Sequence, residues 1–141
     1  MAAQLIDIAL GSDMDLYQDP FTGDFVLIED IEALAQRIRI RLGTQLGEYF
    51  LDLGLGLDYF GEILVKNFDL GLISTRIKSI ILSTPFVDGI RDFEISVTNR
   101  TLSVSMVIET EFGPLVAEAA TSTVTSWMLV LSFPELGPYL R

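Results

Sequence analysis

The chain contains neither cysteine nor histidine. Without cysteine it can form no disulfide, no thiolate nucleophile and no cysteine-ligated zinc site. Without histidine it cannot build a Ser-His-Asp or Cys-His arrangement, and it lacks the usual imidazole metal ligand. Catalysis would have to use carboxylates, tyrosines, serines or the two lysines, Lys66 and Lys78. We therefore expect a protein that is not an enzyme, with no catalytic residue, no cofactor and no metal site.

Long apolar runs are also missing, although 50% of the 141 residues are hydrophobic and the mean hydropathy is +0.45. The longest apolar run, residues 127–133, contains a serine and falls well short of the roughly 18 residues that a membrane helix needs. No basic segment followed by an apolar one marks a secretory signal. The length predicts one folded domain with its own core. The surplus apolar surface favours a protein partner over a membrane.

Positive charge is scarce, because 9 Lys and Arg face 20 Asp and Glu, for a net charge of −11. Residues 1–36 hold eight of the acids and none of the bases. Nucleic-acid binding needs a clustered basic face. The only cluster of bases is Arg37, Arg39 and Arg41. We therefore expect no nucleic-acid partner.

The first half of the chain predicts short strands followed by a helix. Apolar stretches at 5–10, 14–17 and 25–28 surround the turn sequence DPFTG at 19–23, which indicates a β-hairpin. Asp30 is the expected N-cap of a helix that Gly43 ends. The apolar residues of this helix recur at helical spacing: Ile31, Leu34, Ala35, Ile38 and Leu42.

The second half predicts further helices and then a change of period. Asp58 is expected to cap a helix to about Lys66, and Asp69 to cap a second that Pro85 ends. Beyond Pro85, apolar residues alternate at 93–97 and at 102–108 around a turn at 99–100, as in a β-hairpin. A turn at 111–114, a further strand within 121–133 and an extended tail complete the chain. The predicted fold class is α+β: an N-terminal β-hairpin, two to three helices, and a C-terminal antiparallel β-hairpin with an extended tail.

Two pairs of acids have the spacing of a catalytic carboxylate pair. Glu48 with Asp52, and Asp58 with Glu62, stand at i,i+4, which on a helix places the Cβ atoms about 6 Å apart. Glycosidases use carboxyl groups roughly 5–9 Å apart. Nothing in the sequence raises the pKa of one acid while leaving its neighbour ionised, so a solvated face or a cap is the simpler explanation.

A calcium loop and a phosphate-binding loop are also incomplete. Asp13, Asp15 and Asp19 alternate like calcium ligands, but an EF-hand loop starting at Asp13 would need glycine and glutamate where Gln18 and Asp24 stand. The GLGLDY segment at 54–59 lacks the third glycine of a dinucleotide fingerprint. We expect these residues to shape turns.

A longer series of motifs occupies the centre of the chain. Residues 34–52 read LAQRIRIRLGTQLGEYFLD, GLDYFG follows at 56–61, and the next helix ends at Thr84-Pro85. The series resembles the baseplate wedge, or sheath-initiator, proteins of contractile-tailed bacteriophages, especially the Mu-like branch, with relatives in type VI secretion baseplates. The resemblance runs from about Asp7 to Gly113. It divides the chain into a wedge or sheath-initiator-like α+β domain, 1–113, and an apolar C-terminal extension, 114–141, which could be a strand or an interface arm.

The resemblance implies a structural protein of the virion, located in the tail baseplate and assembled in the host cytoplasm. Several copies would form a ring around the tail tube, dock on wedge subunits, and template the first sheath ring by strand addition. The implied partners are the tail sheath protein, other baseplate wedge proteins, and tube or hub proteins, with no nucleic acid and no membrane.

Two segments are the expected partner-binding sites. Much of the wider family carries Glu-Pro-Arg in a loop that contacts the wedge's core bundle, and here Thr84, Pro85 and Phe86 stand at that position. Only the proline is kept, so an apolar contact through Phe86 would replace a charged one. Ser103 and Ser105 lie on the outer face of the second hairpin strand, where an exposed strand edge would invite a partner strand.

Two other functions stay open from the sequence alone. One is a carboxylate-dependent, lysozyme-like glycoside hydrolase, because some relatives of the family were once described in that way. The other is a generic adaptor protein unrelated to tails.

Overall fold

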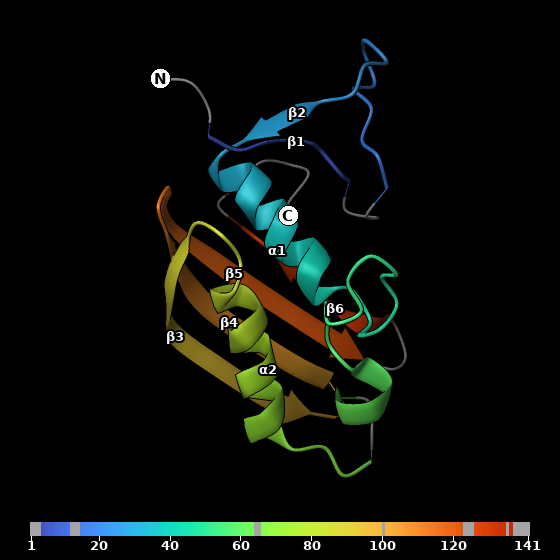
Figure 1. The fold of residues 1–141 in the computed structure, drawn as a ribbon, viewed down its shortest axis with the longest axis vertical. Coiled ribbons are helices and arrows are strands. Elements are labelled where there is room, and N and C mark those ends of the chain that lie inside the picture. The colour runs from blue at the N-terminus through green and yellow to red at the C-terminus, as the bar shows by residue number, and fades with distance from the viewer. Residues whose placement is uncertain are drawn as a thin grey trace.

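The computed structural model describes residues 4–11, 15–63, 66–99, 101–122, 126–134 and 136. The chain folds as α+β, as predicted from the sequence, with a small N-terminal ribbon, helices, and then an antiparallel sheet (Figure 1). The elements in chain order are β1 (Ile6–Ile8), β2 (Leu27–Glu29), α1 (Ile31–Leu42), the π-helical turn η1 (Tyr59–Ile63), α2 (Leu70–Leu82), β3 (Val87–Thr98), β4 (Thr101–Thr110), β5 (Gly113–Ser122) and β6 (Ser126–Ser132).

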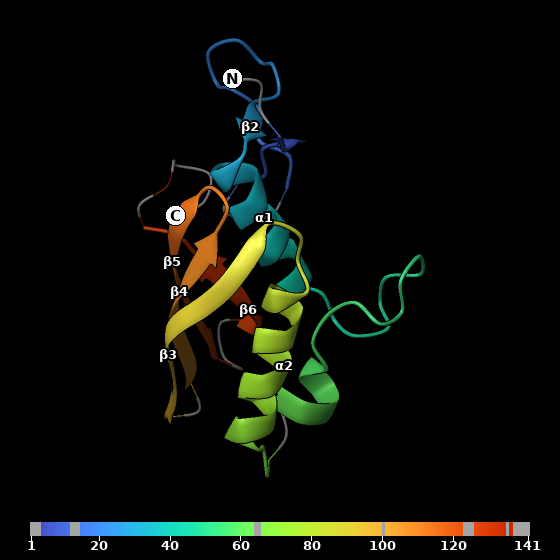
Figure 2. The same cartoon turned by 60° about the vertical axis from the view of Figure 1, so that its left-hand side comes forward.

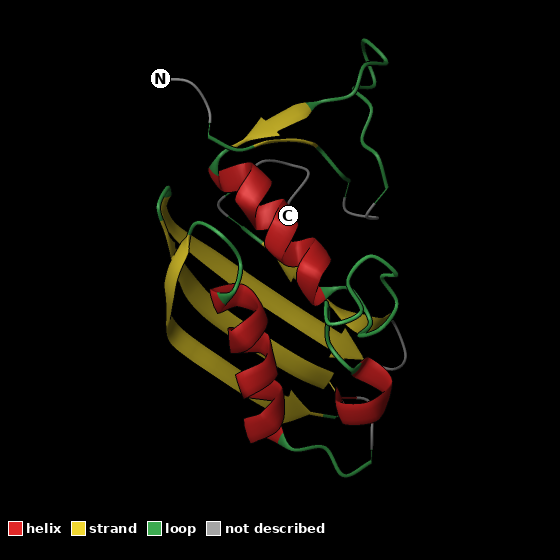
Figure 3. Cartoon of the chain, viewed as in Figure 1, coloured by secondary structure: helices red, strands yellow, loops and turns green. Residues whose placement is uncertain are grey.

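The four C-terminal strands form an up-and-down sheet in the order β3-β4-β5-β6. Helices α1 and α2 lie on one face of it, so the domain has two layers, and no helix or strand among the described residues covers the other sheet face (Figures 2 and 3). Helix α2 packs along β3, and α1 packs against β5 and β6. The core between the layers is formed by buried apolar side chains, among them Leu34, Ile38, Ile73, Ile77, Ile81, Ile108, Leu115, Leu131 and Phe133.

The C-terminal sheet has two strands more than the predicted hairpin. The turn expected at 111–114 is only two residues long, because Thr110 already pairs with Gly113 and β5 starts there. The single strand expected within 121–133 is instead the end of β5 and all of β6. A division of the chain at 113 therefore falls at the first residue of β5, within its pairing with β4. Leu131 is buried, whereas the side chains of Trp127 and Met128 lie outside the described part.

Helices α1 and α2 begin and end close to where the sequence predicts. The Asp69 carboxylate accepts hydrogen bonds from the backbone N–H groups of Gly71 and Leu72, as an N-cap should. Asp30 stands at the N-cap position of α1, as predicted, and its carbonyl accepts from the Leu34 N–H, but its carboxylate does not cap the helix. This residue has a φ of 48° and makes no side-chain hydrogen bond to its own helix. Its Oδ1 accepts instead from the N–H groups of Gln4 and Leu5, which fastens the start of the chain to α1.

The helix expected from Asp58 to about Lys66 is one π-helical turn, Tyr59–Ile63, in the described residues; positions 64 and 65 are not among them. The Asp58 carboxylate accepts from the Gly61 N–H at 2.9 Å, which fixes the start of the turn. A Cβ at Gly61 would lie 2.2 Å from that same carboxylate, so a larger residue there would force the Asp58 side chain out of its present position.

The N-terminal hairpin is a ribbon held against α1. Strands β1 and β2 pair antiparallel, with Ile8 opposite Leu27, and the predicted turn at 19–23 closes through the Gly23 N–H and the Asp19 carbonyl. Gln36 of α1 is buried beneath the ribbon. Its Oε1 accepts from the Leu10 N–H at 2.7 Å and its Nε2 donates to the Ile8 carbonyl at 2.8 Å. The ribbon's inner face is therefore covered by α1.

Candidate functional site

Strand addition needs an edge, and the strand order places the edges of the four-stranded sheet at β3 and β6. Strand β4 pairs with β3 along one side and with β5 along the other. Its backbone groups are therefore used within the chain, and no partner strand can be added at 102–110. Ser103 and Ser105 lie in this interior strand.

Strand β3 has an irregular half and a regular half. Register shifts occur between Val87 and Gly89 and between Arg91 and Glu94, and Asp92 has a φ of 54°. From Glu94 to Thr98 each residue has a direct partner on β4. Bulges are a common protection of sheet edges. The open part of this edge is therefore the run Glu94–Thr98.

The direction of the backbone groups in this run follows from the turn. Thr98 and Thr101 flank a two-residue turn, and such a closing pair exchanges both backbone hydrogen bonds. Bonded and non-bonded pairs alternate along an antiparallel ladder. Ser96 therefore directs its N–H toward β4, whereas Ile95 and Val97 direct theirs to the free side.

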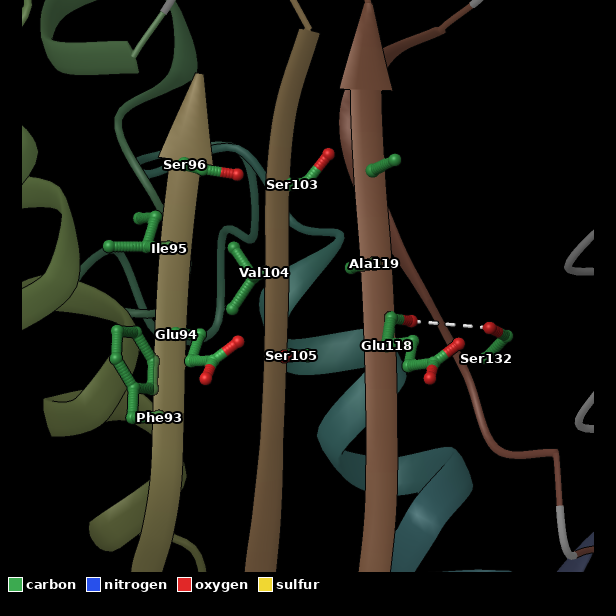
Figure 4. A pocket seen from close by; sticks show the side chains of 11 residues that line it. Phe93, Glu94, Ile95, Ser96, Ser103, Val104, Ser105, Glu118, Ala119 and Ser132 are labelled. Atoms are coloured by element: carbon green, nitrogen blue, oxygen red, sulfur yellow. Dashed lines mark hydrogen bonds between the residues drawn. The ribbon is translucent and has the colours of Figure 1, made fainter. Parts of the chain in front are cut away.

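The outer sheet face carries a polar row that crosses all four strands. Register places Glu94 opposite Ser105, Ser105 opposite Glu118, and Glu118 opposite Ser132 (Figure 4). The Ser132 hydroxyl donates to the Glu118 carbonyl at 3.2 Å. Together with Ser103 and neighbouring side chains this row lines a shallow hollow of about 860 Å³. Ser103 and Ser105 thus belong to a small-residue surface flanked by two carboxylates.

The Thr84–Phe86 loop joins α2 to β3 and exposes mainly Pro85. Thr84 is buried, and its hydroxyl donates to the Ile80 carbonyl at 2.9 Å. Phe86 has a φ of 75° and is half-buried against Phe112, with ring centroids 5.3 Å apart. The apolar contact expected from Phe86 is therefore partly made inside the chain.

The structure does not bring the two predicted segments into one site. Val87, directly after the loop, pairs with Thr110, five residues along β4 from Ser105. That offset corresponds to about 17 Å of extended strand. The loop leaves α2 on the helical side of the sheet, whereas the serines are on the open face.

The candidate catalytic acids act as caps and ion pairs. Residues 48–52 form no helix; the Glu48 carboxylate accepts from the Gln45 N–H, and that of Asp52 from the Gly54 N–H. Asp58 holds the start of η1, and Glu62 pairs with Arg76 at 3.4 Å. Each carboxylate is thus engaged in local structure.

The expected turn residues are also used locally. Asp19 Oδ1 accepts from the N–H groups of Phe21 and Thr22, and Asp15 Oδ1 from that of Leu16. Asp13 lies outside the described residues. Within the described ranges no group of three or more acids could hold a metal ion. Gly56, in the GLGLDY segment, has a φ of 108° and closes a loop.

Sequence reasoning did not identify the outer face of the N-terminal ribbon. Ile6, Ile8, Phe25 and Leu27 are 56%, 41%, 51% and 63% exposed. The signal is present in the sequence, because Ile6 and Ile8 alternate with Asp7, but the apolar stretch at 5–10 predicts a β-hairpin without showing which of its faces stays exposed. Exposed apolar side chains grouped on one face mark an interaction surface.

Comparison with protein families identifies the family of the chain. The model of the contractile injection system sheath initiator matches residues 7–113. The chain belongs to the sheath initiator family. Members of this family are structural components of contractile injection systems. Their role as sheath initiators implies that they interact with sheath and baseplate components. A search of curated proteins finds no match to this chain.

The segment that the family model matches ends as β5 begins, so β5 and β6 extend the sheet beyond it. None of the described helices is long and apolar enough to cross a membrane.

Proposed function

We propose that this sheath initiator is a structural component of a contractile phage tail baseplate, in the virion, and that it templates the first sheath ring by strand addition. Several copies surround the tail tube and dock on wedge subunits, with tube or hub proteins nearby. The Thr84–Phe86 loop, where Pro85 is exposed, is the proposed wedge contact. Ser103 and Ser105 contribute the open sheet face next to the templating edge.

The observation that carries this proposal is the open edge of β3. Glu94–Thr98 is a regular run in direct register with β4, it has no strand partner on its other side among the described residues, and α2 already covers the inner face. Strand β6, the other edge, pairs regularly with β5 only at 118–120, before a register shift. A sheath strand added to β3 would gain main-chain hydrogen bonds without rearrangement of the core.

Two proline variants test the templating edge. Val97→Pro removes an N–H that points to the free side and replaces a half-buried side chain that packs against the core, so we expect a smaller loss of monomer stability than for Ser96→Pro, together with a strong loss of sheath nucleation. Ser96→Pro removes an N–H that serves the β3–β4 ladder, so we expect a loss of about 1–3 kcal/mol of folding stability. The measurements are urea denaturation and electron microscopy of sheath assembled from purified sheath subunits.

The result for Val97→Pro decides between the edges. A stable Val97→Pro protein that nucleates sheath at the wild-type rate would exclude β3 as the template, leaving β6 as the edge to be tested. Ser105→Pro is the interior control; it should destabilise the monomer, because both sides of β4 are paired.

A further inference from the structure

The outer face of the N-terminal ribbon is a second interaction surface, separate from the sheet edge. Ile8 and Leu27 are direct cross-strand partners, and Ile6 lies two residues from Ile8, so all three side chains share one face. Phe25 continues the same alternation from Leu27, and Phe21 at the turn is 95% exposed. We call Ile6, Ile8, Phe25 and Leu27 the ribbon patch.

The ribbon is covered on one face only by the described part of the chain. Its inner face is buried on α1, with Ile28 2% exposed and Gln36 fastening β1, whereas no described element packs on the outer face. A two-stranded ribbon on its own is marginally stable in water, and its apolar faces need cover. Two strands span about 10 Å with their side chains, which is close to the diameter of one α-helix. The missing layer therefore has the width of one helix.

The negative charge near the patch indicates which side chains a helix docked there should carry. Residues 1–36 carry eight acids and no base. Glu29 lies on the patch face itself, opposite Ile6, and Asp15 and Asp24 are exposed nearby along the ribbon. An apolar surface with one carboxylate on its own face and others along the same ribbon is complementary to an amphipathic helix with Lys or Arg beside its apolar stripe.

Other occupants fit less well. A second copy of the chain would bring the same carboxylates face to face, which is repulsive. An added strand would find only three residues in each of β1 and β2. We propose that the ribbon patch docks a basic amphipathic helix of another subunit. This surface does not depend on β3 or on sheath nucleation, so the two proposals fail separately.

A designed peptide tests the proposal with the full chain. The probe is a fluorescent amphipathic helical peptide with leucine on one face and lysine at the flanking positions; the control peptide carries glutamate in place of lysine. We expect the lysine peptide to bind, with amide chemical shift changes confined to the ribbon and α1. The glutamate peptide should not bind.

Variants locate the contact. Ile8→Ser and Leu27→Ser should each weaken binding about tenfold, as loss of an apolar anchor does. Leu82→Ser, at a 50% exposed position on α2, is the matched control and should bind like wild type. Circular dichroism verifies that each variant is folded.

Three outcomes would overturn the proposal. They are equal binding by all variants, equal binding of both peptides, and sedimentation of the chain as a dimer that Ile8→Ser or Leu27→Ser dissociates. The last would identify a second copy as the occupant.

Discussion

At the scale of single residues, the same sequence pattern leads to different contacts. Asp30 and Asp69 each precede an apolar helix, and the N-cap rule describes Asp69 correctly. Asp30 bonds instead to Gln4 and Leu5, which are distant along the chain. A rule based on neighbouring residues cannot predict this bond, because Gln4 and Leu5 reach Asp30 only when the ribbon folds onto α1.

Gly56 is a second residue whose role only the structure shows. It has a φ of 108°, and a Cβ there would lie 2.3 Å from the Thr44 carbonyl oxygen. This close approach lets Gln45 and Leu57 pair at the base of the loop, with the Leu57 N–H donating to Thr44 at 2.9 Å. The sequence indicates a loop at these glycines, but it does not distinguish the required glycine from its neighbour.

Substitution of the two glycines tests this difference. Gly56→Ala should lower the free energy of unfolding by about 1–3 kcal/mol or more. Alanine is strained at a positive φ, and its Cβ would also clash with the backbone. Gly54→Ala should change it by less than about 0.5 kcal/mol, since its Cβ would meet only the Asp52 carboxylate, at an ordinary 3.5 Å. Urea denaturation of both variants is the measurement. Equal effects would contradict the structural role of Gly56.

At the scale of elements, helices and strands with a clear apolar period can be predicted from the sequence, whereas a strand built from small side chains cannot. Helices α1 and α2 and the β3–β4 hairpin follow from apolar spacing. Strand β5 was missed because its inward positions include Ala117 and Ala119, opposite an outer face with Val116 and Ala120, so the apolar alternation is almost absent. Its conformation is set by pairing with β4 along its entire length. The β3 edge, on which the proposed function depends, was likewise invisible until strand order was known.

A truncation tests whether β5 and β6 belong to the folding unit. Ending the chain after Gly113 removes Leu115, Leu131 and Phe133 from beneath α1 and exposes the edge of β4. We expect loss of cooperative unfolding and of near-UV circular dichroism. Ending the chain after Leu136 keeps all four strands and should leave both signals intact. A cooperatively folded protein ending at Gly113 would show that the matched segment is self-sufficient.

At the scale of the whole molecule, the surplus apolar composition is concentrated in two places. One is the ribbon patch, and the other is the loop after α1, where Phe50 is 80% and Leu51 70% exposed. The mean hydropathy predicted that apolar surface would remain for partners, but not its location. Location depends on which apolar residues the two layers can enclose, and neither the ribbon's outer face nor the loop lies between them (Figure 2).

Because the base of that loop is closed by hydrogen bonds, we expect that the chain can be cut at the loop tip into two fragments that still associate. Leu46 and Thr44 are bonded to Leu57 across the base, and the Tyr59 hydroxyl donates to the Leu42 carbonyl, so the two arms are held together below the exposed tip. The ribbon and α1 lie before the tip, while α2 and the entire sheet lie after it. Fragments 1–50 and 51–141, expressed together, should therefore reassemble by complementation and copurify with a native circular dichroism spectrum. Fragments divided within α2, between Arg76 and Ile77, should not. The tip is consequently a place where a label or a foreign domain can be inserted while both halves keep their shared core.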